Sequence, residues 1–265
     1  MGKLSDKVIW ITGASSGIGE ALAFQLSRQN VKLIISARRE EELQRVKERC
    51  GGGDDIRIIC LDLAESDSMP AKVKEALACY GQVDILVNNG GISQRSLIKD
   101  TPMEVDRRVM EVNYFGTIAL TKAILPHMIA QQAGHIAVVT SAVGIITTRY
   151  RSGYAAAKHA LHGFFDTLRI EHHADNIKVT LILPGSVLSN ASQNALMANG
   201  QPQNKIEEAH LAGLTSEQCA SRIISAIETD KEEAYVAGIK VKFGLYLKRW
   251  WPTMFSKMIR KAKVT

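Results

Sequence analysis

The chain has 265 residues, of which 46% are hydrophobic, so it can form one large domain with a substantial core. No apolar run reaches the roughly 18–20 residues that a transmembrane helix needs, and the N-terminus leads into a strand without the apolar segment of a signal peptide. The net charge is +6, but eight basic residues and no acidic one follow residue 238, which leaves 25 basic and 27 acidic residues before it, so nucleic-acid binding by the main domain is not expected.

Short apolar runs alternate along the chain with helical patterns. Strands are predicted at residues 8–11, 32–36, 56–61, 84–87, 135–140, 179–183 and 234–237, and helices at 17–27, 40–49, 68–80, 101–130, 153–172 and 215–228. The helices that begin near Thr101 and Thr215 start with capping motifs, in which Glu or Gln follows the Thr by three residues. Because the strands are apolar on both faces, we predict a doubly wound α/β Rossmann fold, with a seven-stranded, mainly parallel sheet and helices on both faces.

We assign residues 1–238 to this domain and residues 239–265 to a basic amphipathic C-terminal extension. Residues 188–213 form a long irregular stretch and are predicted as a substrate lid, in which Met197 favours apolar substrates. In the extension, apolar residues at helical spacing alternate with basic ones; they are Leu247, Trp251, Met254 and Met258. Such a helix could contact a membrane surface through residues 247–263, or it could pack on a partner subunit or over the substrate entrance, and packing is the commoner use.

The four cysteines are scattered, without C-x-x-C spacing or a histidine cluster; they are Cys50, Cys60, Cys79 and Cys219. Disulfides persist in oxidising compartments, and zinc sites need clustered ligands. We therefore interpret the cysteines as reduced thiols of a cytoplasmic protein, with peripheral membrane contact as the alternative, and expect no metal site.

A glycine-rich turn follows the first predicted strand, with the spacing G-x-x-x-G-x-G. Glycines in such a turn let the backbone approach a pyrophosphate at a helix N-terminus, although the turn alone could be purely structural. The predicted dinucleotide-binding residues of this turn are Thr12, Gly13, Ser15, Ser16, Gly17, Ile18 and Gly19.

The ends of the next two strands bear on the choice of cofactor. Arg38 and Arg39 stand where sheets that bind NAD usually carry an acidic residue, and arginine binds the 2′-phosphate of NADP(H). We predict NADP(H), the alternative being that both arginines pair with residues 40–42 at the start of a solvated helix. Asp62 and Leu63 end the third strand, where Asp62 would bond the adenine amino group or cap a turn.

A candidate catalytic group lies in the second half of the chain. Tyr154 and Lys158 are four residues apart in a predicted helix, so they share one face, and Ser141 ends the preceding strand. The lysine would lower the pKa of the tyrosine, Ser141 would donate a hydrogen bond to a carbonyl oxygen, and Lys158 would also hold ribose hydroxyls. Asn113, flanked by apolar residues, is predicted to hold a water that relays protons to Lys158.

Together these motifs resemble the short-chain dehydrogenase/reductase family, of the roughly 250-residue type, over about residues 7–237. Residues 112–116 and 154–166 are most similar to the dehydrogenase/reductase member 7B group, itself similar to 11β-hydroxysteroid dehydrogenases. The resemblance implies a catalytic tetrad and further cofactor contacts. The tetrad is Asn113, Ser141, Tyr154 and Lys158, and the further contacts are Asn89, Gly90, Pro184, Gly185, Val187 and Ser189, where Gly90 replaces the usual Ala and Ser189 the usual Thr.

The predicted function is an NADP(H)-dependent oxidoreductase of the EC 1.1.1 type. It would interconvert a ketone or aldehyde and an alcohol on a small apolar substrate (steroid, retinoid, lipid or xenobiotic carbonyl), with Tyr154 as general acid/base. The alternatives are a 3-ketoacyl-carrier-protein reductase and a non-catalytic NADP-binding scaffold at a membrane surface. Family members usually pair through their long helices, so we expect a homodimer or homotetramer.

Overall fold

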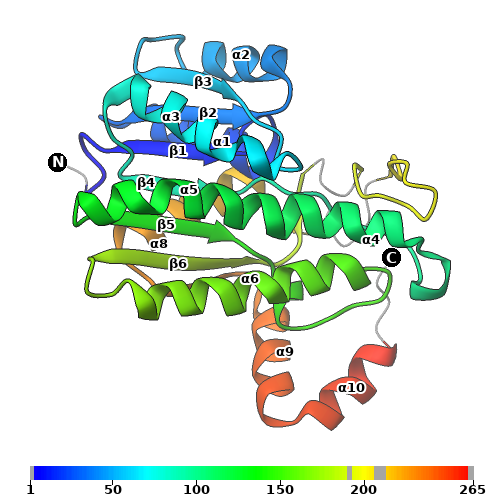
Figure 1. Ribbon diagram of the computed structural model, residues 1–265. Coiled ribbons are helices and arrows are strands. Elements are labelled where there is room, and N and C mark those ends of the chain that lie inside the picture. The colour runs from blue at the N-terminus through cyan, green and yellow to red at the C-terminus, as the bar shows by residue number, and fades with distance from the viewer. Residues whose placement is uncertain (1–2, 190–192, 206–212, 262–265) are drawn as a thin grey trace.

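The computed structural model describes residues 3–189, 193–205 and 213–261 (Figure 1). Seven strands form one sheet in the order β3-β2-β1-β4-β5-β6-β9, and all neighbouring strands pair in parallel. The strands are β1 (Val8–Thr12), β2 (Lys32–Ala37), β3 (Ile56–Cys60), β4 (Ile85–Asn88), β5 (Gly134–Val139), β6 (Ile177–Pro184) and β9 (Glu233–Val236). The predicted doubly wound sheet is confirmed.

Helices cover both faces of the sheet. The first face carries α1 (Gly17–Leu26), α2 (Glu40–Arg49) and α8 (Ser216–Glu228). The second face, toward the viewer in Figure 1, carries α3 (Met69–Tyr80), α5 (Gly116–Ala130) and α6 (Ser152–Glu171). A shorter helix, α4 (Met103–Met110), leads into α5 through a π-helical turn (Glu111–Phe115).

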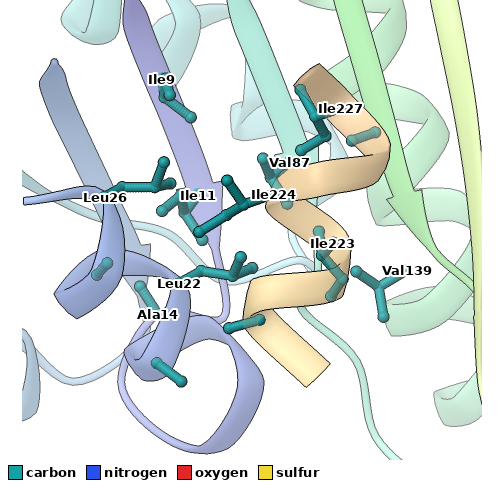
Figure 2. Packing of buried hydrophobic residues seen from close by; sticks show 14 of the residues in the cluster. Ile9, Ile11, Ala14, Leu22, Leu26, Val87, Val139, Ile223, Ile224 and Ile227 are labelled. Atoms are coloured by element: carbon teal, nitrogen blue, oxygen red, sulfur yellow. The ribbon is translucent and has the colours of Figure 1, made fainter. Parts of the chain in front are cut away.

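The central strand β1 shows how one strand serves both faces. Ile9 and Ile11 point toward α1 and α8, where they join one apolar cluster with residues such as Leu22 and Ile223 (Figure 2). Trp10, between them, points to the other face, and its indole N–H donates to Ser36 Oγ at 2.8 Å. Because every second residue of a strand faces the same side, an unbroken apolar run buries both faces.

The two predicted capping motifs have different outcomes. At α8, Thr215 Oγ1 accepts from Gln218 N at 3.2 Å and Gln218 Oε1 accepts from Thr215 N at 3.1 Å, so the capping box is confirmed. At α4 the prediction is wrong, because Pro102 occupies the N-cap position and the Thr101 hydroxyl donates to Leu97 O at 2.7 Å.

The segment predicted as a lid is framed by two short strands, β7 (Val187–Leu188) and β8 (Leu214–Thr215), which pair in parallel. Within it, Leu196 N donates to Ser93 O at 2.9 Å. Met197 is 42% exposed. Residues 190–192 and 206–212 of the predicted lid lie outside the described part of the chain.

The C-terminal extension forms two helices, α9 (Ile239–Trp250) and α10 (Pro252–Lys261), which project from the domain as a V-shaped pair (Figure 1). The predicted apolar stripe does not share one face, because the chain turns between the helices: Leu247 is 4% exposed and Trp251 is 63% exposed. The residues that pack are Ile146, Leu245, Leu247 and Phe255. Across the described ranges, no helix combines the length and the apolar character that crossing a bilayer requires.

Candidate active site

A cleft of about 700 Å³ lies at the carboxyl ends of the strands, where parallel α/β sheets bind their ligands. Three of the four predicted catalytic residues line it; they are Ser141, Tyr154 and Lys158. Most predicted cofactor-binding residues line it as well; they are Gly13, Ser15, Ser16, Gly17, Ile18, Arg38, Arg39, Asp62, Leu63, Asn89, Gly90, Pro184, Gly185, Val187 and Ser189. Thr12, Gly19 and Asn113 are buried behind its wall.

The glycine turn is held tightly against the end of β4. Gly13 has a φ of +65°, and a Cβ there would lie 2.7 Å from Gly90 Cα. The Thr12 hydroxyl accepts from the backbone N–H groups of Asn89 and Gly90, at 3.1 and 3.0 Å. A Cβ at Gly19 would lie 2.2 Å from Gly13 O, so only glycine fits. Thr12 and Gly19 therefore shape the turn from behind.

The turn suits a phosphate group. It leads into the N-terminus of α1, and the lining residues Ser15 to Ile18 bring the first backbone N–H groups of that helix to the cleft. Among the described groups, the Ser16 side chain makes no capping bond to α1. Arg39 also borders an adjoining hollow at the same helix N-terminus, which Glu20, Glu42 and Glu217 line as well.

At the end of β3, Asp62 caps a turn. Its Oδ1 accepts from Ala64 N at 2.9 Å, and its Oδ2 lies 3.9 Å from Arg108. The turn-cap alternative is thus realised, and a second oxygen remains for an adenine contact. Leu63 fills the space next to Gly90, since a Cβ at Gly90 would lie 2.7 Å from Leu63 Cδ1. A Cβ at position 90 would therefore need the Leu63 side chain to shift.

Ser141, Tyr154 and Lys158 converge from two elements. Ser141 follows β5 and caps a short 3₁₀ turn (Ala142–Gly144), where its Oγ accepts from Val143 N at 3.1 Å. Tyr154 lies in the first turn of α6, with Lys158 one turn later. Lys158 Nζ donates to Val139 O at 2.9 Å and lies 5.7 Å from the centre of the Tyr154 ring.

Burial governs the ionisation of this group. It raises the pKa of the Tyr154 phenol, against which the charge of Arg151 and a hydrogen bond with Ser141 act. Burial also lowers the pKa of Lys158 to about 8. The positive charge that acts against this rise is that of Arg151. The role of Lys158 in lowering the pKa of Tyr154 stays a prediction.

Asn113 lies in the π-helical turn and is fully buried. Its side chain clamps the loop after β4, because Oδ1 accepts from Ile92 N and Nδ2 donates to Ile92 O, both at 2.8 Å. A Cβ at the neighbouring Gly91 would lie 2.7 Å from Asn113 Oδ1 and 3.8 Å from Lys158 Nζ. Asn113 is therefore close to Lys158, with its amide bonded to the backbone of Ile92.

The strand end after β6 closes the cleft on the other side. Gly185 N donates to Val236 O at 3.0 Å, which ties this turn to β9. Ser189 lies beside the glycine turn, since a Cβ at Gly17 would lie 3.2 Å from Ser189 Cβ. The Ser189 hydroxyl thus belongs to the phosphate end of the cleft.

Several lining residues were not predicted. Apolar or small ones are Gly91, Ile92, Ser93, Val112, Val139, Ala195, Leu196 and Pro202, and the charged ones are Arg95, Arg108 and Arg151. One signal was present for Arg151, which precedes Tyr154 by three residues and so starts the same helix. Arg95 is brought to the cleft by loop contacts that have no local sequence pattern.

The motifs and this geometry agree with a comparison against protein families. The family model described as short chain dehydrogenase matches residues 7–199. The chain belongs to the short-chain dehydrogenase/reductase family. It is accordingly an oxidoreductase that uses a nicotinamide cofactor.

Relatives within the short-chain dehydrogenases/reductases extend the match to nearly the whole chain. Human dehydrogenase/reductase SDR family member 7 is 43% identical over 259 residues, which cover 95% of this chain and 76% of the human protein. Member 7B of Xenopus tropicalis is 37% identical over 268 residues, which cover 98% and 87%. The predicted resemblance to member 7B is confirmed, and member 7 is matched at higher identity.

The fold is also that of solved members of the family. A short-chain dehydrogenase/reductase from Burkholderia phymatum, solved in complex with NAD, superposes with a TM-score of 0.85. The match covers 96% of each chain at 21% sequence identity. At this identity the comparison supports the fold alone.

Proposed function

We propose that this chain is an NADP(H)-dependent oxidoreductase that interconverts a ketone or aldehyde and the corresponding alcohol on a substrate with an apolar body. The observation that carries the proposal is the shared cleft: Ser141, Tyr154 and Lys158 line the same space as the glycine turn. A proton donor and a phosphate-binding turn at one cleft are what carbonyl reduction by a nicotinamide requires.

Each residue of the group has a separate task in reduction. The bound cofactor, NADPH, would supply the hydride that the carbonyl carbon accepts. Tyr154 gives its hydroxyl proton to the carbonyl oxygen, and Ser141 donates a hydrogen bond to that oxygen as charge develops on it. Lys158 favours the phenolate that forms and holds the ribose hydroxyls, and Asn113 supports the relay that returns a proton to Tyr154.

The choice of NADP(H) rests on Arg38 and Arg39, which line the cleft at the end of β2. The alternative was that they pair with the acidic residues that begin α2. Glu42, one of those residues, pairs with Arg45 at 3.0 Å. Two arginines, with no acidic residue between the end of β2 and Glu40, favour a 2′-phosphate at this point.

We assign residues 1–238 to the catalytic domain and residues 239–265 to a C-terminal extension, of which the described residues, 239–261, pack beside the domain. Packing of the extension is supported by the buried cluster around Phe255. Membrane contact through residues 247–263 is the alternative use of its exposed aromatic and basic residues, and co-sedimentation with anionic phospholipid vesicles would distinguish the two.

The deciding experiment follows the oxidation of NADPH and of NADH against a panel of apolar ketones. We expect turnover with NADPH, and a loss of about 10²- to 10⁴-fold in kcat in Tyr154→Phe, because the variant lacks the proton donor. Tyr246→Phe, which removes the hydroxyl of an exposed tyrosine in α9, is the matched control and should keep full activity.

Three results would contradict the proposal or its choice of cofactor. Equal activity in Tyr154→Phe and the unmodified protein would remove Tyr154 from the chemistry. NADPH binding without turnover on any ketone would favour the non-catalytic scaffold. A preference for NADH would reverse the assignment of Arg38 and Arg39.

A further inference from the structure

Two arginines line the cleft on the side of Tyr154. Arg95 lies in the loop after β4, and Arg151 immediately precedes α6, three residues before Tyr154. The roles proposed above use neither of them. In the proposed function, the glycine turn and Arg38 would bind the phosphates of the dinucleotide at the other end of the cleft.

The backbone brings the two arginines to one place. Ser96 N donates to Tyr150 O at 3.1 Å, and Ser96 and Arg151 form a parallel β-bridge. Arg95 N donates to Leu196 O at 2.7 Å. The loop after β4, the residues before α6 and the segment around Leu196 are thus joined near Tyr154.

A buried glutamine fixes this arrangement. Gln94 is fully buried, and its Nε2 donates to Ser96 Oγ at 3.0 Å and to Thr101 Oγ1 at 3.1 Å. Its Oε1 accepts from Gly153 N, in the first turn of α6, at 3.0 Å. Because Gln94 adjoins Arg95 and Gly153 is two residues from Arg151, both arginines start from fixed backbone positions.

The electrostatics favour an anion between them. Burial, and after it the charge of Arg151, lowers the pKa of Arg95 to about 9. Burial also lowers the pKa of Arg151, whose charge acts on Tyr154. Among the described lining residues the only acidic one is Asp62, near Arg108. Both arginines also interact with other groups of the chain, so a ligand would compete with or extend those interactions.

We propose that Arg95 and Arg151 bind a carboxylate of the substrate, so that this enzyme acts on apolar carbonyl compounds that carry an acidic group. A guanidinium presents paired N–H donors that match the two oxygens of a carboxylate. The apolar part of the compound would lie against Ile92, Leu196 and Pro202, which line the same cleft. This inference rests on the proposed carbonyl chemistry at Tyr154.

The test compares keto acids with their methyl esters, which have the same carbonyl group and chain but no charge. The probes are 9-oxodecanoate, methyl 9-oxodecanoate and their shorter and longer homologues, since chain length sets the span from carbonyl to carboxylate. With NADPH, we expect kcat/KM for the best acid to exceed that for its ester by about 10- to 100-fold, the range for hydrogen bonds to charged groups.

Arg95→Met should lose that preference through a higher KM for the acid. The ratio of kcat/KM for acid and ester, measured within the same variant, separates this effect from a loss of folded protein. Arg151→Met should lose the preference and also raise the pKa of Tyr154, so its pH profile for alcohol oxidation should shift to higher pH. Arg107→Met, an equal substitution at an exposed position of α4, should keep the preference.

Equal kcat/KM for acids and esters at every chain length, or a preference that survives in both Arg95→Met and Arg151→Met, would overturn the inference. Calorimetric titration of 9-oxodecanoate into the NADPH-loaded protein distinguishes a failure of this inference from a failure of the proposed function. Binding that Arg95→Met abolishes supports the inference even without turnover, in which case the proposed reaction fails. If 9-oxodecanoate does not bind but the esters are reduced, the inference is overturned and the proposed function stands.

Discussion

Several strongly perturbed ionisable groups lie together at the cleft. Burial disfavours the charged forms of Tyr154, Lys158 and Arg95 alike, which raises the first pKa and lowers the other two. With a pKa of about 8, Lys158 remains mostly protonated at neutral pH and loses its charge above that value. Perturbed groups that share a cleft are typical of functional sites.

At the same scale, Arg38 and Arg39 are expected to select the cofactor. Replacing both with alanine should raise KM for NADPH by about 10- to 100-fold, because each guanidinium loses its bond to the 2′-phosphate. KM for NADH, which lacks that phosphate, should be nearly unchanged and serves as the internal control. Initial rates with both cofactors measure the effect, and an equal loss for NADH would show that the arginines support the fold instead.

Sequence patterns predicted the glycine turn and the catalytic residues of the cleft, but not the arginines near Tyr154. Tyr154 and Lys158 could be found because helical spacing brings them together, and the glycine turn because its spacing is rare. Arg95 could not be found, since its place depends on backbone bonds from the loop after β4 to Leu196 and, through Ser96, to Tyr150. Such long-range pairings have no periodic signal in the sequence.

At the scale of elements, the α9–α10 pair supports the loop that carries Ser141. Ile146 lies just after the 3₁₀ turn that follows Ser141, and it packs in one cluster with Phe255. The Lys248 ammonium donates to the neighbouring Ile145 O. Phe255→Ala should weaken the docking of the pair by about 2–4 kcal/mol, the range for a large-to-small change in a packed cluster, and lower kcat. Hydrogen exchange should become faster at residues 239–261 and 142–149.

Met254→Ala is the matched control, because Met254 precedes Phe255 in α10 but is 57% exposed. It should leave hydrogen exchange and kcat unchanged. Similar exchange in the two variants would mean that the extension does not brace the catalytic loop.

The secondary-structure prediction was wrong where contacts with distant residues determine the backbone conformation. Residues 101–130 have the pattern of one helix, but Asn113 bonds to Ile92 and the helix there takes a π turn. Such turns often occur at functional sites and leave no periodic trace. At the other extreme, Thr215 and Gln218 cap their helix as predicted, because that motif is complete within four residues.

At the scale of the whole molecule, we expect the chain to pair through its long helices. Large apolar side chains are exposed on this side, among them Met103 in α4, Phe115 before α5 and Ile170 in α6. Light scattering at micromolar protein should give a dimer or tetramer, and Phe115→Glu should shift it toward the monomer. Ile239→Glu, in the extension, is the control. A monomer for the unmodified chain would contradict the expectation.

The chain has three tryptophans, and their different exposure gives the main domain and the C-terminal helices different fluorescence. Trp10 is buried between sheet and helices, whereas Trp250 and Trp251 are exposed at the junction of α9 and α10. A buried indole fluoresces at shorter wavelength than a solvated one and is shielded from soluble quenchers such as acrylamide. The long-wavelength, quenchable part of the emission therefore comes from the C-terminal helices alone, and any surface that covers them would become visible in the unlabelled protein.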